Sequence, residues 1–310
     1  KDPCQHYICQ LNDTIHYYGS LSSVFLFPQW DNNFDVSDGI PSEHPRYEPG
    51  KPAFKHDYIP EMVQQYADQA AAMQELGFDM AYIHAAYRGL PIARFLSPLT
   101  NTRQDEYGGS LENRARFLLE VCDAIKRKCG KDFLLEVCLS GEDPAGRGGM
   151  TLQDTVELVK LGEGHFDLVQ LRASEIDPAH PTGYNKKHMP FLYMSEALKN
   201  AGVKTPVELI GGCFYPQECE DVIASGKADF VAMARSWISN PEYGQLVYEG
   251  RDEDITPCIR CNKCHRPTPG QMWLSTCSVN PEWGIENRLG RLVAPVTDKK
   301  KVAIVGGGPA

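Results

Sequence analysis

The chain has 310 residues, of which 42% are hydrophobic and 23% charged, a balance typical of globular proteins. It contains 31 Lys and Arg against 41 Asp and Glu, so the formal net charge is −10, which argues against general nucleic-acid binding. No apolar run approaches the roughly 18 residues that span a bilayer, and the first residues lack the apolar core of a signal peptide. We therefore expect a cytoplasmic protein without nucleic-acid or membrane partners.

Short apolar runs alternate along the chain with amphipathic stretches, the pattern of parallel strands joined by helices. We predict a strand at 6–11, followed by a long irregular stretch at 12–57. Helices are expected at 59–77, 111–130, 151–164, 190–202, 216–227 and 241–250, with Thr151 and Asp154 capping the third. The further strands are expected at 78–86, 133–140, 166–173, 206–212 and 228–235.

Six strands in this order predict an α/β fold of the (β/α)8 TIM-barrel type. A closed barrel needs eight strands, and a sheet lacking two would expose its edges. We therefore expect the chain to begin inside the barrel, with the first two βα units absent. The predicted organisation is a partial barrel at 1–250, a metal-binding segment and linker at 251–298, and the start of another domain at 299–310.

Four of the eleven cysteines form one block, Cys258, Cys261, Cys264 and Cys277. The other seven are scattered and are interpreted as free thiols, mostly buried. Three closely spaced thiolates and a distant fourth followed by Pro281 favour a [4Fe–4S] cluster. A zinc site is the alternative, although zinc ribbons usually present two CxxC pairs.

The last residues, KKKVAIVGGGPA, combine an apolar run with a glycine-rich turn. Such a turn after a buried strand is typical of dinucleotide-binding domains, in which the glycines let the backbone approach a pyrophosphate. The sequence therefore predicts the first strand of a Rossmann-like domain at 299–310, with Gly306 and Gly308 at the cofactor.

In (β/α)8 barrels, the functional residues lie at the carboxyl ends of the strands and in the loops that follow. The last two such loops carry Gly212 and Cys213, and Ala234 and Arg235. Backbone N–H groups and an arginine in these two loops are the usual phosphate-binding elements of such barrels. The alternative for the glycines is a tight turn alone.

His84 lies near the carboxyl end of the strand predicted at 78–86, and Tyr87 directly follows that strand. Both side chains can donate hydrogen bonds, and either could polarise a carbonyl or protonate a carbon. The alternative is a strand-end histidine with its hydrogen bonds satisfied, next to a tyrosine that only packs.

Residues 77–121, GFDMAYIHAAYRGLPIARFLSPLTNTRQDEYGGSLENRARFLLEV, resemble the old yellow enzyme family. The run FLSP followed by N-x-R-x-D-x-Y-G-G-S-L-E-N-R carries this resemblance most specifically. The cysteine block and VGGGPA extend it to the multidomain branch with 2,4-dienoyl-CoA reductase, trimethylamine dehydrogenase and bile-acid NADH:flavin oxidoreductases. The stretch 12–57 matches poorly.

The resemblance implies a flavin enzyme acting on a small molecule. A monomer and a homo-oligomer are both compatible with the sequence. NAD(P)H would reduce FAD, the [4Fe–4S] cluster would pass electrons to FMN, and FMN would deliver hydride to a C=C bond. The substrate would be an α,β-unsaturated carbonyl compound: an enone, an enoate or an enoyl thioester. The alternatives are oxidative amine demethylation of the trimethylamine type, or an electron-transfer subunit without a substrate of its own.

Residue by residue, the resemblance implies that Gln10 contacts the FMN pyrimidine. The loop residues Gly212, Cys213, Ala234 and Arg235 would hold the FMN phosphate. His84 and Tyr87 would occupy the two positions that polarise the substrate.

This sequence departs from the family pattern at two positions. Cys138 stands where the family places an arginine against the flavin, so that cation is missing unless Arg172 replaces it. Gly89 stands where many relatives have a proton-donating tyrosine, a role that Tyr87 could take over.

Overall fold

The computed structural model describes residues 3–26, 58–87, 90–173, 187–264, 276–286, 288–289, 298–303 and 305–306. It divides into two compact units, Lys1–Met233 and Ala234–Ala310, which we call unit 1 and unit 2. Unit 1 contains the sheet, and unit 2 contains the cysteine block.

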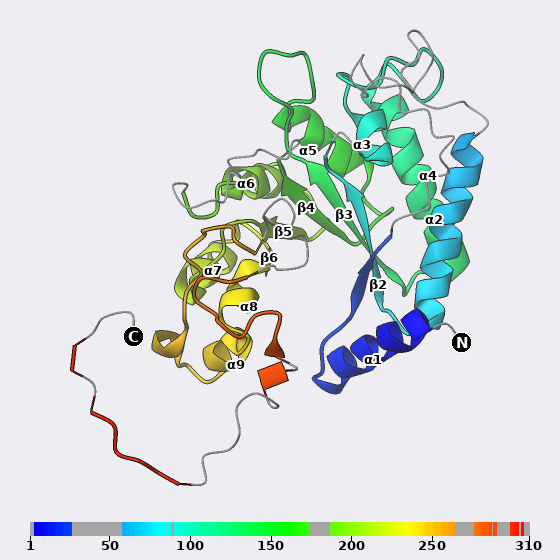
Figure 1. The fold of residues 1–310 in the computed structure, drawn as a ribbon. Helices are drawn as coiled ribbons and strands as arrows, with labels where there is room; N and C mark the ends of the chain where they lie inside the picture. The colour runs from blue at the N-terminus through cyan, green and yellow to red at the C-terminus, as the bar shows by residue number, and fades with distance from the viewer. Residues whose placement is uncertain are drawn as a thin grey trace, which may run out of the picture. The chain divides into compact units, whose positions relative to one another are not determined.

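Unit 1 is built on one curled sheet of six parallel strands, arranged in sequence order as in a barrel (Figure 1). The strands are β1 (Ser23–Phe25), β2 (Met80–Ala85), β3 (Leu134–Ser140), β4 (Leu168–Arg172), β5 (Val207–Ile210) and β6 (Phe230–Ala232). The last five lie within the predicted ranges, so the predicted α/β fold with a barrel-like parallel sheet is confirmed.

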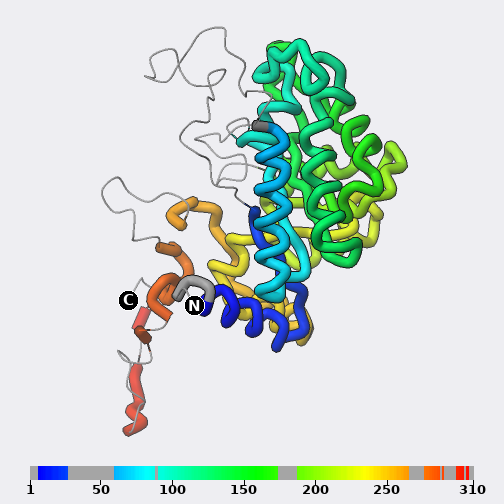
Figure 2. The backbone as a smooth tube through the Cα atoms, turned by 90° about the vertical axis from the view of Figure 1, so that its right-hand side faces the viewer, coloured from blue at the N-terminus to red at the C-terminus, as the bar shows by residue number. Residues whose placement is uncertain are grey.

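Helices connect the strands and cover the outer face of the sheet, where they follow one another around its curve (Figures 1 and 2). They are α2 (Tyr58–Glu75), α4 (Leu111–Cys129), α5 (Leu152–Leu161), α6 (Leu192–Asn200) and α7 (Pro216–Ala224). The predicted cap of α5 is confirmed, because Thr151 Oγ1 accepts from the Asp154 N–H while the Asp154 carboxylate accepts from the Thr151 N–H.

Alternation along the strands separates an apolar face from a polar one. The outward side chains pack with the helices in the main hydrophobic core and include Ile83, Val137 and Val169. The alternate positions carry polar groups such as His84, Glu136 and Gln170. The concave face of unit 1 therefore carries the polar side chains that could take part in binding or catalysis.

The predicted strand at 6–11 is wrong, because these residues belong to helix α1 (Pro3–Tyr17). The less exposed side of α1 carries Ile8, Asn12 and Ile15, spaced four and three residues apart as a helix requires. Gln10 is exposed on this helix and its amide nitrogen lies 3.1 Å from His6 Nε2. Gln10 is not at a strand end, which removes the basis for placing it against a flavin.

The first strand of the sheet lies instead within the stretch predicted to be irregular. β1 pairs with β2 in parallel, with Phe25 opposite Tyr82. The Asp79 carboxylate fixes the entry to β1, since it accepts from the Ser22 N–H and lies 2.7 Å from His16 Nε2. The part of the chain that the structure describes has six strands in its sheet, as many as predicted, but the first was misplaced.

The run that carries the family resemblance forms a hydrogen-bonded loop between helix α3 (Pro91–Leu96) and α4. The Asn101 side-chain N–H group donates to the carbonyls of Phe95 and Tyr107, both at 2.7 Å. Arg114 Nε donates to the Leu96 carbonyl at 2.8 Å. These polar residues therefore hold the loop in shape.

Unit 2 begins with helix α8 (Arg235–Ser239), followed by α9 (Tyr243–Tyr248) and the 3-10 turn η1 (Asp252–Asp254). The helix predicted at 241–250 is thus confirmed. The strand predicted at 228–235 is shorter than expected, because β6 ends at Ala232 and α8 begins at Arg235.

The strand predicted at the start of 299–310 is absent from the described residues 298–303 and 305–306. Val302 is 80% exposed and Val305 fully exposed. A buried parallel strand forms only with neighbouring strands to pair with, so the apolar run alone does not produce one. Gly306 has a φ of 104°, whereas Gly308 lies outside the described residues.

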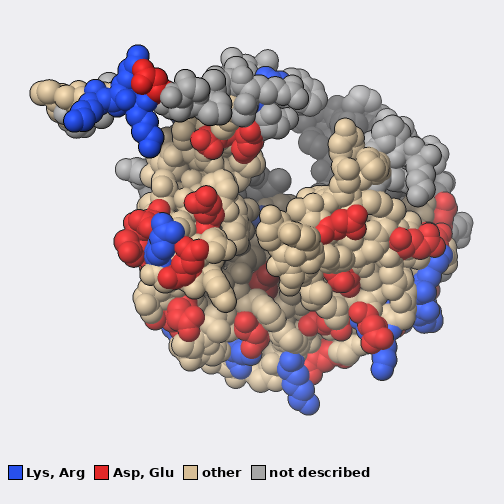
Figure 3. All heavy atoms as spheres, turned by 90° about the horizontal axis from the view of Figure 1, so that it is seen from below, with Lys and Arg blue, Asp and Glu red and all other residues tan. Residues whose placement is uncertain are grey.

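Among the described residues, none of the helices combines the length and apolar character needed to cross a bilayer. On the face drawn in Figure 3, acidic and basic side chains are interspersed, and no broad basic surface spreads across it.

Candidate active site on the concave face

The register of the sheet brings polar residues of neighbouring strands together on the concave face of unit 1. His84 of β2 is the Cα partner of Cys138 of β3, which in turn pairs with Gln170 of β4. Arg172, two residues after Gln170, lies on the same face at the carboxyl end of β4. Three residues singled out from the sequence, His84, Cys138 and Arg172, therefore lie on adjacent strands.

Aromatic rings surround His84. Its ring centroid lies 5.9 Å from that of Phe25, 5.8 Å from that of Tyr82 and 4.9 Å from that of Tyr87. The structure thus brings the predicted pair, His84 and Tyr87, into direct contact. Phe25 and Tyr82 complete this aromatic group.

His84 is held in its neutral form. Burial, and then the positive charge of Arg172, lower the pKa of His84 to about 4. The Ala86 N–H donates to His84 Nδ1 at 3.3 Å, so a neutral ring carries its proton on Nε2. His84 can therefore donate a hydrogen bond from Nε2 at neutral pH.

The Arg172 guanidinium lies over the Tyr87 ring, with its carbon 4.5 Å from the ring centroid. The groups around it are neutral at pH 7. Burial raises the pKa values of Tyr82 and Tyr87, and it raises the pKa of Cys138 to about 12. Arg172 consequently provides the positive charge at the centre of this group.

Two carboxyl groups lie further along the concave face and are bridged by Gln170. The Gln170 side-chain N–H group donates to Glu136 Oε1 at 3.2 Å and also to Glu208. Tyr82 extends this hydrogen-bond network, because its hydroxyl group donates to Gln170 Oε1 at 3.3 Å. Burial, and then the neighbouring Glu208, raise the pKa of Glu136 to about 8, so this carboxyl retains its proton at neutral pH.

Sequence reasoning missed Glu136, Gln170 and Glu208. The strand sequences did contain a signal for them, since each of these polar residues interrupts an apolar run. Glu136 and Gln170 lie two positions before Cys138 and Arg172, and Glu208 lies opposite Gln170 on the next strand. Reading the strands with a period of two, as well as at their ends, would have identified these residues.

The loop after β5 turns on two glycines, Gly211 and Gly212, with φ angles of 93° and 76°. A Cβ atom on Gly212 would lie 2.7 Å from the Met189 nitrogen, so glycine is required there. Gly212 and the buried Cys213 belong to unit 1, whereas Ala234 and Arg235 are the first residues of unit 2. The phosphate site predicted from both pairs stays a prediction.

The predicted metal ligands lie in unit 2 on a chain that turns sharply between them. Arg260 and Asn262 adopt positive φ angles of 59° and 58°. The Arg260 N–H donates to Cys258 Sγ at 3.4 Å, and the Cys261 thiol donates to Ser278 Oγ at 3.3 Å. A backbone N–H directed at a cysteine sulfur two residues earlier is suited to stabilising a thiolate ligand.

No three His, Cys, Asp or Glu side chains within the described ranges are grouped closely enough to bind a single metal ion. The cysteine donor set nevertheless fits an iron–sulfur cluster. The cubane is larger than one ion, and each of its irons takes one thiolate, so the four sulfurs need not meet at a point. Arg235 also belongs to this part of unit 2, because its Nη1 donates to Asn262 Oδ1 at 2.5 Å.

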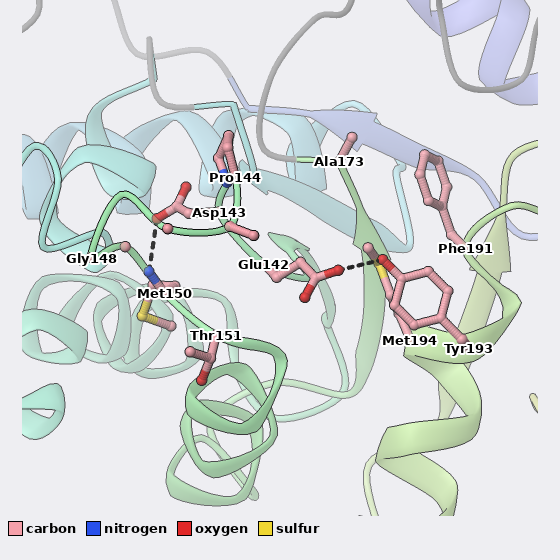
Figure 4. Close-up of a pocket in the computed structure, with 13 residues that line it drawn as sticks. Glu142, Asp143, Pro144, Gly148, Met150, Thr151, Ala173, Phe191, Tyr193 and Met194 are labelled. Carbon is pink, nitrogen blue, oxygen red and sulfur yellow. Dashed lines mark hydrogen bonds between the residues drawn. The ribbon is translucent and has the colours of Figure 1, made fainter.

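A pocket of about 600 Å³ opens at the carboxyl ends of β3 and β4 (Figure 4). Its walls include Met150, Phe191 and Met194, and Ala173 places it next to Arg172 in sequence. Glu142 and Tyr193 point toward each other, and the Tyr193 hydroxyl donates to Glu142 Oε1 at 2.6 Å. None of the predicted site residues lines this pocket, which the sequence did not reveal.

Comparison with known proteins identifies the family. Residues 31–254 match the NADH:flavin oxidoreductase / NADH oxidase family. An NADH oxidase of Thermoanaerobacter brockii is 36% identical over 257 residues, which cover 81% of this chain and 39% of that protein. A cinnamate reductase of Clostridium sporogenes is 31% identical over 269 residues, which cover 81% of this chain and 40% of that protein.

The solved complex of a 2-naphthoyl-CoA reductase with 2-naphthoyl-CoA is 28% identical and superimposes with a TM-score of 0.82. This match covers all of the present chain and 50% of the other. The chain spans about 40% of the length of the NADH oxidase and of the cinnamate reductase. The resemblance inferred from residues 77–121 is confirmed, and since the family match covers well over half of the chain, the protein belongs to the NADH:flavin oxidoreductase family and is an oxidoreductase.

Proposed function

We propose that the protein is a flavin-dependent ene-reductase that reduces the C=C bond of an α,β-unsaturated carbonyl compound with electrons from NAD(P)H. The observation that carries this proposal is the neutral His84, whose Nε2 proton is available beside Tyr87 and Arg172. Such a group of donors suits a carbonyl oxygen that gains negative charge during reduction. The relatives named for the reduction of cinnamate and of 2-naphthoyl-CoA support the same reaction class.

The residues of unit 1 fit a flavin mononucleotide. The turn at Gly211 and Gly212 presents backbone that a phosphate could approach, and the concave face offers polar donors to the edges of a ring system. We propose that Gly212 and Cys213 contribute backbone N–H groups to the phosphate site. When bound, FMN supplies the hydride for the reaction.

The side chains near His84 would orient and protonate the substrate. His84 donates from Nε2 to the carbonyl oxygen, which withdraws electrons from the C=C bond. Tyr87 is positioned to supply the proton that one carbon of the double bond must gain, because burial keeps its hydroxyl protonated at neutral pH. This assignment gives Tyr87 the role that Gly89 cannot fill.

We further propose that Cys258, Cys261, Cys264 and Cys277 hold a [4Fe–4S] cluster, which supplies single-electron transfer. The positive φ angles between these cysteines support this assignment, because they aim backbone N–H groups at sulfur. FAD and NAD(P)H complete the proposed electron path, with Gly306 and Gly308 at the start of the FAD-binding domain.

The test is anaerobic photoreduction of the purified holoenzyme, followed by addition of an enone or of cinnamate while the flavin absorbance is recorded. We expect the alkene to restore the absorbance of the oxidised flavin. If trimethylamine instead reduces the oxidised flavin, the protein is an amine dehydrogenase. If neither compound reacts, it is an electron-transfer subunit without a substrate of its own.

A further inference from the structure

We propose that Arg172 binds the carboxylate of the substrate, so that the enzyme selects α,β-unsaturated carboxylates over neutral enones. This inference rests on the proposed function, because it names the substrate class of the same site. It follows from the position, the charge balance and the hydrogen-bonding capacity of one side chain.

The position of Arg172 places its charge beside the proposed reacting groups. It is the last residue of β4, and its backbone is anchored where the Gly141 N–H donates to the Arg172 carbonyl at 2.8 Å. Its guanidinium carbon lies 4.5 Å from the centroid of the Tyr87 ring, which is itself 4.9 Å from that of His84. A substrate that contacts His84 and Tyr87 therefore lies within reach of Arg172.

Within the described ranges, the side chains that interact with Arg172 do not balance its positive charge. The groups closest to Arg172 are Tyr82, Tyr87 and Cys138, all of which are neutral at pH 7. No ion pair between Arg172 and a carboxylate is found among the described residues, and Glu136 on the same face keeps its proton at neutral pH. His84 is neutral as well. The described side chains that interact with Arg172 therefore supply no negative charge.

A half-buried cation without an anionic partner is unfavourable, and a bound anion relieves that cost. The guanidinium offers five N–H donors in one plane, a geometry that matches the two oxygens of a carboxylate. Its flat contact with the Tyr87 ring also limits the orientations it can adopt. Arg172 is therefore prepared for a planar anion.

The charge of Arg172 also helps the reduction of an enoate, whose C=C bond is only weakly activated. A carboxylate withdraws electrons from a C=C bond less well than a ketone, because it is already negative. Reduction adds a hydride to the β carbon and a proton to the α carbon, so the π bond breaks and two C–H bonds form. The reduced flavin supplies the two electrons of the hydride and is reduced again by NAD(P)H. After the hydride is added and before the proton arrives, negative charge increases on the carboxylate oxygens, where the Arg172 cation stabilises it.

The experiment compares a matched pair of substrates, cinnamate and the neutral ketone 4-phenyl-3-buten-2-one, with the holoenzyme and its variants. Arg172→Gln should lower kcat/KM for cinnamate about 100-fold, and it should shift the ratio of kcat/KM for cinnamate to that for the ketone by about 30-fold, because only cinnamate loses a charged partner. Arg172→Lys, which retains the charge but lacks the planar pair of donors, should recover only part of the cinnamate activity. Arg127→Gln, at an exposed position near the end of α4, removes the same charge and should leave both substrates unaffected.

A binding measurement separates this inference from the proposed function, because it requires no reduction. Calorimetric titration with 3-phenylpropanoate should show about 100-fold weaker binding to Arg172→Gln than to the wild type, whereas 3-phenylpropanamide should bind both equally. Equal loss of both substrates, together with a lower flavin midpoint potential, would mean that Arg172 serves the flavin and would overturn the inference. Unchanged binding of the carboxylate would overturn it too. Carboxylate binding that depends on Arg172, without alkene reduction, would retain the anion site and reject the ene-reductase.

Discussion

At the scale of single residues, the candidate site depends on the protonation states that burial imposes. His84 is neutral because burial and Arg172 both disfavour its charged form. Its tautomer is set by the Ala86 N–H, which occupies Nδ1 and leaves the proton on Nε2. Tyr87 and Cys138 are kept protonated by burial. The site therefore offers neutral donors and one fixed cation.

Replacing His84 tests its assignment as the donor to the substrate carbonyl. His84→Ala should lower kcat/KM for alkene reduction about 100-fold, because the oxygen loses a hydrogen bond that strengthens as charge develops. NADH-dependent reduction of a dye should change much less, since it does not use this hydrogen bond. Equal losses in the two assays would show that His84 has only a structural role.

The same side chain predicts a pH profile. Because the pKa of His84 is lowered to about 4, its protonation should not produce an inflection in alkene reduction between pH 6 and 8. Steady-state rates across this range test the point, and an inflection that disappears in His84→Asn would contradict it.

Single residues also mark where sequence reasoning succeeds and fails. His84, Tyr87 and Arg172 could be identified because they lie at or just after the carboxyl ends of strands with clear apolar runs. Gln10 was misassigned because six residues of α1 also fit a strand, and only the wider spacing of Ile8, Asn12 and Ile15 shows the helix. A short window cannot distinguish these two periods.

At the scale of elements, most of unit 1 could be predicted because its strands and helices carry strong signals. The helices α4 and α5 have capping residues, Ser110 and Thr151, in addition to their apolar periodicity. β1 has only three residues, so its pairing with β2 rather than its own composition defines it. The polar concave face could not be derived from strand positions alone, since its contacts depend on the register between strands.

The buried carboxyl pair of β3 and β5 should make stability depend on pH. The pKa of Glu136 is raised to about 8 in the folded protein, above its ordinary value of 4.5. The folded state therefore benefits fully below pH 4.5, and stability falls as the pH rises toward 8, because the unfolded chain releases this proton first. Glu136→Gln should remove most of this decline and stabilise the protein by about 2 kcal/mol at pH 8.

Thermal unfolding of the wild type and of Glu136→Gln between pH 5 and 8 measures this effect. The exposed Glu75→Gln on α2 serves as the matched control and should leave the profile unchanged. If the melting temperatures of the wild type and of Glu136→Gln depend on pH in the same way, Glu136 does not retain its proton in the folded protein.

At the scale of the whole molecule, the chain joins two units with different chemistry. Unit 1 carries the concave face, and unit 2 carries the four cysteines. The family of the protein could be predicted because the sequence between α3 and α4 carries a motif specific to that family. Polar residues of this motif form the hydrogen bonds that hold the loop in shape. The arrangement of the cysteines and the conformation of the described residues after 298 could not be predicted. The cysteines depend on the group that they bind, and a buried parallel strand depends on neighbouring strands.

Removing one cysteine of unit 2 tests the division of roles between the units. Cys261→Ser should lose the iron of the cluster and separate NADH oxidation from substrate reduction, while the flavin of unit 1 stays bound. Iron analysis and flavin absorbance provide the two readouts, and Cys129→Ser at the end of α4 is the control. An iron content equal to that of the wild type would eliminate the proposed relay.

The central claim is that this protein transfers a pair of electrons to an activated C=C bond. The most direct measurement is a single turnover, in which anaerobically reduced holoenzyme is mixed with cinnamate and the products are quantified against the flavin that is reoxidised. We predict one 3-phenylpropanoate for each pair of electrons released. Reoxidation without the saturated acid, or no reoxidation by any enone or enoate, would contradict the claim.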